Sequence, residues 1–177
     1  MKNCVIAAVK DEKTMQRACN SNVSMIFDLA PKIDELEKRI ELCKTSGKIL
    51  FIHIDMAEGI GKDKAGLKYA KEKGIVGIIS TRSTLIKYAQ ELGLRTVQRM
   101  FILDSQSLET GIEMIKIKPD MIEIMPGVIS SKVIKRICEK AKLPVIAGGL
   151  IETPEEVEKA IKAGVVAVST GKEKLWK

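Results

Sequence analysis

The sequence predicts an α/β protein in which residues 1–177 form one domain, a compact (β/α)8 barrel of the TIM type, and two observations predict it. Short apolar runs rich in β-branched residues recur eight times, with starts about 20 to 26 residues apart. That spacing is the length of one strand, one crossover helix and two short loops. Amphipathic stretches separate the runs, and such strict alternation implies a parallel sheet with right-handed crossovers, which eight units can close.

Each of the eight runs is expected to form one strand of the barrel. In chain order they are VIAAV from Val5, MIFDL from Met25, ILFIHID from Ile49, IVGIIS from Ile75, TVQRMFI from Thr96, MIEIM from Met121, PVIAG from Pro144 and VVAVS from Val165.

The segments between the runs are expected to be helices. In KIDELEKRIELCK, residues 32–44, the apolar residues share one helical face. Glu35 and Arg39 stand four residues apart in this segment, which predicts an ion pair on the surface. STLIKYAQELG, residues 83–93, repeats the pattern and ends at Gly93.

The segment TPEEVEKAIKAG, residues 153–164, carries the clearest helix signals. Thr153 and Glu156 have the spacing of a capping box, and Pro154 stands at the first helical position. Gly164 supplies a stop at the other end. We therefore expect a helix between the seventh and eighth strands.

The chain is short for this fold, since barrels of this type usually run to about 250 residues. We therefore expect short loops and a reduced final helix. The alternative is an open doubly wound sheet. Such a sheet often carries a glycine-rich nucleotide fingerprint at its first turn, and the turn AAVKDEKT, residues 7–14, contains no glycine.

Composition indicates a folded, water-soluble chain, with 45% apolar and 30% charged residues. No apolar run approaches the roughly 18 residues that a membrane span needs, and no secretory signal is evident, so we expect a cytoplasmic protein. The four cysteines lack metal-ligand spacing and are expected to be reduced core residues. One histidine excludes a multi-histidine metal site, and no cofactor fingerprint is present, so neither a metal nor a cofactor is predicted.

The net charge of +7 favours an anionic partner, either a phosphorylated metabolite or a nucleic acid. The cations are spread over many lysines, without an arginine tract or a basic tail. A merely solvated cationic surface is therefore the alternative interpretation.

Small and hydroxyl residues follow the last two strands. In such barrels the loops after strands seven and eight commonly hold a phosphate, because glycines let backbone N–H groups face the anion. AGG and STGKEK stand at these two positions. We predict phosphate binding by Gly148, Gly149, Ser169, Thr170 and Gly171, with purely structural tight turns as the alternative.

Several charged or polar residues interrupt the apolar runs near the strand ends, and we expect them to line a ligand pocket. A carboxylate inside an apolar strand is costly unless it is paired or used. Asp28 and Glu123 are of this kind, and pairing with Arg99 is the structural alternative to ligand binding. His53 and Asp55 are two residues apart and would face the same side.

A catalytic set is not predicted. A Schiff-base aldolase needs a desolvated lysine inside the barrel, and none of the runs contains one internally. An enediol isomerase needs a base and a neutral electrophile. Glu123 and His53 could be nominated for these roles, but nothing in their spacing demands it.

Six stretches, taken together and in order, resemble a known family. They are HIDMAEG (53–59), GIISTR (77–82), TVQRMFILDS (96–105), IEIMPG (122–127), VIAGGLI (145–151) and AVSTG (167–171) with the final LW. The chain resembles the glycerol uptake operon antiterminator regulatory proteins, which respond to glycerol 3-phosphate. The resemblance implies a (β/α)8-like regulator in which this effector promotes binding to leader mRNA and prevents premature termination of transcription.

The resemblance also implies roles for the predicted residues. The two glycine and hydroxyl loops would face the ligand phosphate, while His53, Asp55, Arg99 and Glu123 would surround the glycerol. The loop MAEGIGKD, residues 56–63, departs from the more apolar version typical of the family. Glycerol 3-phosphate and leader mRNA are thus the expected partners, without a membrane, and a homodimer is possible for a barrel of this size.

Two alternatives to this function stay open. One is a small barrel enzyme, isomerase or aldolase-like, acting on a phosphorylated metabolite with Glu123 or Asp55 as base. The other is a sensor of a phosphorylated ligand that acts through a protein partner instead of RNA.

Overall fold

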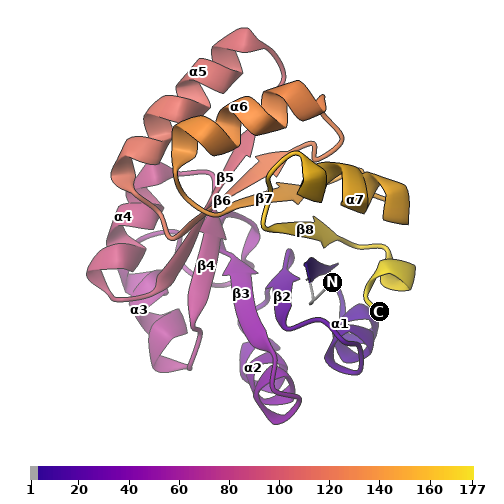
Figure 1. Ribbon diagram of the computed structural model, residues 1–177. Helices are drawn as coiled ribbons and strands as arrows, with labels where there is room; N and C mark the ends of the chain where they lie inside the picture. The colour runs from indigo at the N-terminus through magenta and orange to yellow at the C-terminus, as the bar shows by residue number, and fades with distance from the viewer. Residues whose placement is uncertain (1–3) are drawn as a thin grey trace.

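The computed structural model describes residues 4–177 and confirms the predicted barrel. The eight parallel strands follow one another in chain order, and the last pairs with the first to close the sheet (Figure 1). Their bounds are β1 Val5–Val9, β2 Met25–Asp28, β3 Ile49–His53, β4 Gly77–Ser80, β5 Arg95–Phe101, β6 Met121–Met125, β7 Val145–Gly148 and β8 Ala167–Thr170.

Within residues 4–177, seven α-helices lie outside the strands, one between each pair of consecutive strands (Figure 1). After β8 the chain forms only the short 3-10 helix η3 (Glu173–Leu175), as the chain length predicts. The other bounds are α1 Glu12–Cys19, α2 Leu36–Thr45, η1 Ile54–Met56, α3 Lys64–Glu72, α4 Ser83–Glu91, α5 Ser105–Met114, η2 Ile115–Ile117, α6 Ser131–Ala141 and α7 Pro154–Lys162.

Alternation along the strands builds two layers of core. One buried apolar side chain from each of strands β1 to β7 joins a cluster that fills the barrel interior. The residues between them face outward and pack under the helices. The interior cluster consists of Ile6, Phe27, Phe51, Ile79, Val97, Met121 and Ile146.

Helix α7 confirms the capping signals in the sequence. The Thr153 hydroxyl accepts a hydrogen bond from the Glu156 backbone N–H, and the Glu156 carboxylate accepts one from the Thr153 N–H. Pro154 occupies the first helical position, and Gly164 follows the helix with a left-handed φ of 111°. None of the helices within residues 4–177 combines the length and hydrophobicity needed to cross a lipid bilayer.

Helix α2 differs from the prediction in two ways. It begins at Leu36 rather than near residue 32, because Lys32 forms an isolated parallel bridge with Glu58. The predicted surface pair of Glu35 and Arg39 is also wrong in its location. The Arg39 side chain is only 4% exposed, because it reaches inward past Glu35 to the buried carboxylate of Asp28.

Candidate functional site at the barrel mouth

The carboxyl ends of the strands open into a hollow of about 380 Å³, which we term the mouth pocket. Four of the five predicted phosphate-binding residues line it, together with Arg99 from the predicted ligand pocket. The structure therefore brings β5, β7 and β8 to one site, although they lie far apart in the sequence. The lining residues are Ala8, Lys10, Asp11, Thr14, Leu29, Arg99, Met125, Gly149, Leu150, Ile151, Glu152, Ser169, Thr170, Gly171 and Lys172.

Both glycines at the end of β7 are required by their surroundings. A Cβ atom on Gly148 would lie 2.4 Å from Oε1 of Glu123 and 2.7 Å from Oγ of Ser169, so this position has no room for a side chain. Gly149 has a φ of 76°, in the left-handed region that favours glycine. The next residue, Leu150, also has a positive φ of 61° and is largely exposed.

This backbone path leaves several donors free at the pocket. Among the described residues, no acceptor engages the backbone N–H groups of Gly149, Leu150 or Gly171, all of which line the mouth pocket. A phosphate carries several acceptor oxygens, and clustered backbone N–H groups are its usual partners in proteins. The loops after β7 and β8 are therefore suited to hold an anion.

We term the five predicted phosphate-binding residues, in the loops after β7 and β8, the phosphate cradle. Its two hydroxyl groups have partners within the protein. The Ser169 hydroxyl donates to Oε1 of Glu123. The Thr170 hydroxyl donates to the carbonyl oxygen of Ile151 at 2.7 Å and accepts from the Lys172 N–H. Both hydroxyl protons are thus used within the protein, and the free donors of these loops are backbone groups.

Glu123 and Arg99 form a buried pair beside the pocket. Nε of Arg99 donates to Oε2 of Glu123 at 2.7 Å, and the Glu123 side chain is fully buried. Within residues 4–177, no hydrogen bond engages either terminal nitrogen of Arg99. The pair expected as a structural alternative therefore exists, yet it still leaves part of the guanidinium available to a ligand.

His53 and Asp55 lie outside the residues that line the mouth pocket. Nε2 of His53 is 3.5 Å from Oδ2 of Asp55 but has no hydrogen-bond partner in the described chain. Asp55 instead accepts hydrogen bonds from Ser80, from the backbone and hydroxyl of Thr81, and from Arg82. Burial opposes ionisation of Asp55, but these contacts and His53 outweigh it and lower its pKa. Asp55 therefore ties η1 to the end of β4.

Asp28 does not face the pocket, contrary to the prediction. Phe27 points into the barrel, so the neighbouring side chain of Asp28 points outward, towards α2. There Nη1 of Arg39 lies 2.8 and 2.7 Å from the two carboxylate oxygens. The Asp28 carboxylate is fully buried and neutralised by Arg39, so it holds α2 against the barrel.

Two cations of the mouth pocket were missed as site residues by the sequence analysis. Lys10 follows β1 in phase with the inward-facing Ile6, and within the described chain its ammonium group has no ion-pair partner. Lys172 follows β8 and lies 2.9 Å from a carboxylate oxygen of Glu152. The period-2 phase of the first strand was the signal that could have identified Lys10.

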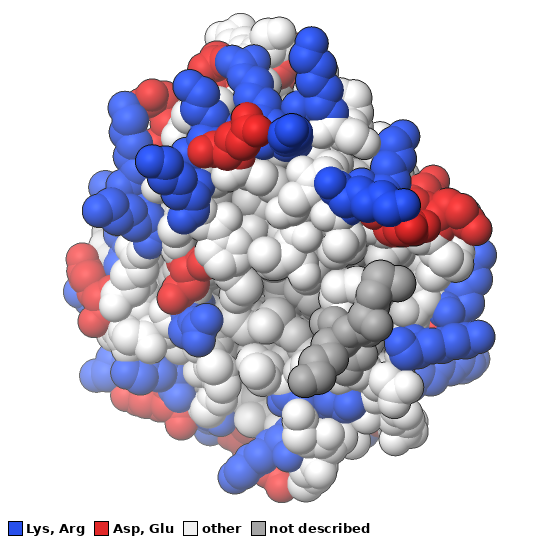
Figure 2. Space-filling model, viewed as in Figure 1, with Lys and Arg blue, Asp and Glu red and all other residues white. Residues whose placement is uncertain are grey.

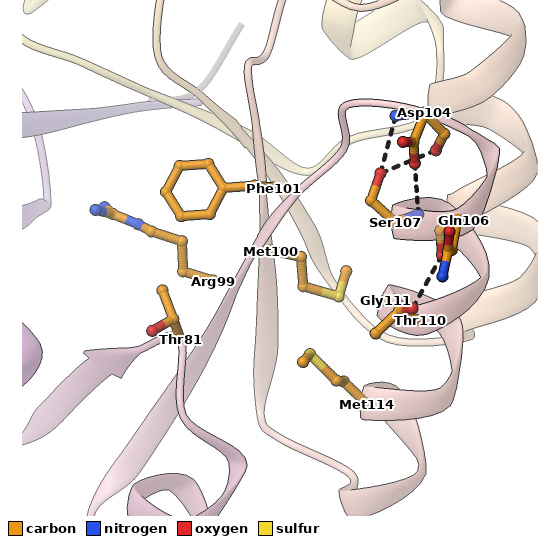
Figure 3. A pocket seen from close by; sticks show the side chains of 10 residues that line it. All are labelled: Thr81, Arg99, Met100, Phe101, Asp104, Gln106, Ser107, Thr110, Gly111 and Met114. Carbon is orange, nitrogen blue, oxygen red and sulfur yellow. Dashed lines mark hydrogen bonds between the residues drawn. The ribbon is translucent and has the colours of Figure 1, made fainter.

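A second hollow of about 370 Å³ lies beside β5 and α5 (Figure 3). Figure 3 shows Arg99 and Phe101 on one side of the strand, and Met100 on the other, towards α5. The Asp104 and Ser107 side chains there cap the start of α5 through reciprocal hydrogen bonds. The Asp104 and Ser107 groups are thus used within the protein, and Arg99 is the residue that this hollow shares with the mouth pocket.

The family model of the glycerol-3-phosphate responsive antiterminators matches residues 5–176. The chain belongs to this family. The resemblance noted in the sequence motifs is thereby confirmed. Among curated proteins, the uncharacterized Escherichia coli (strain K12) protein YgcP is 38% identical over 176 residues, which are 98% of this chain and 92% of that protein.

Solved structures agree with the antiterminator family. The glycerol uptake operon antiterminator regulatory protein of Listeria monocytogenes is 31% identical, with a TM-score of 0.93 over 99% of this chain and 96% of that one. An antiterminator-related protein of Thermotoga maritima is 32% identical, with a TM-score of 0.87 over 99% of each chain. An aldolase at 15% identity and TM-score 0.73, over 98% of this chain and 90% of that one, shows only the shared fold.

Proposed function

We propose that the protein binds glycerol 3-phosphate in the mouth pocket, and that the bound ligand promotes contact with the leader mRNA of glycerol-utilisation genes. In this role it prevents premature termination of transcription. The observation that supports the proposal most is the set of unpaired N–H groups on Gly149, Leu150 and Gly171 in one pocket. The family description supplies the identity of the phosphorylated ligand.

The phosphate group would lie against the loops after β7 and β8. Backbone N–H groups from both loops would donate to its oxygens, and the ammonium groups of Lys10 and Lys172 would compensate its charge. These interactions do not depend on the hydroxyl protons of Ser169 and Thr170, which have partners in the protein.

The glycerol portion would extend towards the centre of the barrel mouth. The terminal nitrogens of Arg99 are available there as donors to hydroxyl oxygens, and Glu123 fixes the guanidinium through its Nε. Because Glu123 also accepts from Ser169, the carboxylate links β5, β6 and β8 under the ligand. The ligand would therefore be held by groups whose positions are set before it binds.

The proposal assigns no catalytic role to the chain and no cofactor. No lysine is buried among residues 4–177, which leaves no described candidate for a Schiff base inside the barrel. Both oxygens of Glu123 accept hydrogen bonds from protein groups. Turnover of triose and pentose phosphates, lost in Glu123→Gln, would contradict this assignment and favour the enzyme alternative.

Calorimetry with the purified protein tests the ligand directly. We expect saturable binding of glycerol 3-phosphate, weaker binding of inorganic phosphate and none of glycerol. Binding to a leader transcript is then measured with and without the ligand over a salt series. Ligand-dependent affinity that weakens with salt supports RNA contact, whereas an affinity unchanged by ligand at every salt concentration contradicts the regulatory proposal.

A further inference from the structure

A groove lined by lysines runs between α6 and α7, away from the mouth pocket. It has a volume of about 600 Å³ and carries lysines on both of its helical walls. Lys132 and Lys135 belong to α6, and Lys159 and Lys162 belong to α7. We term this hollow the lysine groove, after these four residues. Its remaining lining residues are Ser131, Glu155, Glu158 and Ala163.

Most cations of the lysine groove have no internal partner. Lys162 lies 2.6 Å from Glu158. Within residues 4–177, Lys132, Lys135 and Lys159 form neither an ion pair nor a side-chain hydrogen bond. Figure 2 shows Lys and Arg side chains around the rim of one face, including its upper part, where Figure 1 places α5, α6 and α7.

Helix α3 shows that this lack of partners is not general. The lysines of α3 and its C-cap residue Lys73 each have a partner in the protein. Lys64 pairs with Glu91 at 2.5 Å, Lys68 lies near Glu72, and Lys73 pairs with Glu37. Lys71 donates to the carbonyl oxygen of Leu92. The positive charges on α3 are thus compensated within the protein, whereas three of the four in the lysine groove have no partner in the described chain.

The loops that carry α6 and α7 are joined beside the mouth pocket. The Gly127 N–H, in the loop before α6, donates to the carbonyl oxygens of Gly148 and, at 3.0 Å, Gly149. The chain then runs from Gly149 through Leu150 to the start of α7. Lys159 lines both the lysine groove and a small cavity of about 130 Å³ under residues 127–129.

We propose that the lysine groove binds the sugar–phosphate backbone of RNA. The proposal rests on the proposed function, because it locates the RNA contact of that regulator. Cations on two facing walls suit a strand lying between them, whereas a lipid surface would need a flat or convex face. Lysine ammonium groups act as point charges towards phosphates, so this contact supplies affinity more than sequence preference.

The loops before α6 and α7 could transmit the effect of ligand binding from the mouth pocket to the lysine groove. An anion bound by Gly149 and Leu150 would fix the loop that leads into α7. The Gly127 hydrogen bonds would extend that effect to the start of α6. Both walls of the lysine groove would then be held in one relative position, which lowers the entropy lost on RNA binding.

The test compares two triple variants with equal loss of charge. Lys132→Gln/Lys135→Gln/Lys159→Gln removes the three lysines of the lysine groove that are unpaired within residues 4–177 and keeps Lys162. The matched control is Lys64→Gln/Lys68→Gln/Lys73→Gln, on α3 and its C-cap residue. Each is titrated with a labelled leader transcript from the glycerol-utilisation operon of the same genome, and with a scrambled transcript of equal length. Circular dichroism and calorimetry with glycerol 3-phosphate verify that both variants fold and bind the ligand.

We expect the groove variant to bind the leader at least about tenfold more weakly at 0.15 M salt, and its log–log salt slope to fall by about 2, since each phosphate contact contributes about 0.7. The α3 variant should stay near the wild type. Equal loss in both variants, or wild-type binding by the groove variant, overturns the lysine groove alone. A wild-type protein that binds no leader RNA overturns the proposed function as well.

Discussion

Arg99 is held by Glu123 through Nε at 2.7 Å, in a pair whose carboxylate is fully buried and whose guanidinium is nearly so. The terminal nitrogens of Arg99 stay available at the mouth pocket. This single contact supports both the interior of the barrel and the proposed ligand site. Its two roles can be separated by mutation.

Replacing Arg99 by Met should destabilise the protein by about 3–5 kcal/mol, because it leaves Glu123 buried without its cationic partner. Urea unfolding measures this change in the free energy of unfolding. Adding Glu123→Gln to the variant removes the uncompensated charge and should restore part of the loss. Neither protein should bind glycerol 3-phosphate well, whereas a single variant that loses less than about 1 kcal/mol would contradict the buried pair.

Two glycines of the cradle should respond differently to the same methyl group. Gly148→Ala places a Cβ 2.4 Å from Glu123 and should cost about 1–3 kcal/mol of stability through overpacking. At Gly171 the nearest atom to an added Cβ is the carbonyl oxygen of Ala8 at 3.5 Å, so Gly171→Ala should fold with nearly wild-type stability. Thermal unfolding of the two variants, side by side, makes the comparison.

The loops of the cradle could be predicted from the sequence because a closed barrel brings the ends of β7 and β8 to the same face. To predict the position of these loops, only the strand order and the small residues at the strand ends were needed. The pocket cations were harder to predict. Lys10 reads as one more exposed lysine in a chain with 30 Lys and Arg residues, and only the phase of β1 distinguishes it.

The orientation of Asp28 could not be predicted from its own segment. Its neighbours Phe27 and Leu29 are apolar, so the run shows no alternation from which an inward or outward face can be assigned. For Arg39 the sequence predicted exposure instead of burial, because its spacing from Glu35 is that of an ordinary surface pair. The partner that buries Arg39 stands on a different element, and only the packing of α2 on β2 reveals it.

Asp28→Ala tests this reassignment. It leaves the Arg39 guanidinium buried with one fewer partner, so we expect a loss of about 3–5 kcal/mol in the free energy of unfolding. The affinity for glycerol 3-phosphate should be unchanged at a temperature where the variant is folded, because the carboxylate faces α2. A selective loss of ligand affinity would contradict this assignment and indicate that Asp28 contacts the ligand.

The lowered pKa of Asp55 predicts a pH dependence of stability. A carboxyl group whose pKa is lower in the folded state stabilises the protein above its unfolded pKa of about 3.9, and this contribution is lost as the pH falls below that value. Asp55→Asn removes the titration. The difference in unfolding free energy between wild type and variant should therefore be largest above about pH 5 and should shrink from about pH 4 downwards. A constant difference across that range would contradict the assignment.

Lys10 offers the sharpest test of the phosphate cradle, because Lys13 provides a matched control on the exposed face of α1. Lys10→Gln removes one charge-assisted contact from the proposed phosphate, worth about 1.5–3 kcal/mol. Calorimetry should therefore show affinity for glycerol 3-phosphate reduced by about 10- to 100-fold. Lys13→Gln changes the net charge equally and should leave the affinity unchanged. Equal weakening in both variants would mean that the pocket attracts the ligand only through the overall charge of the protein.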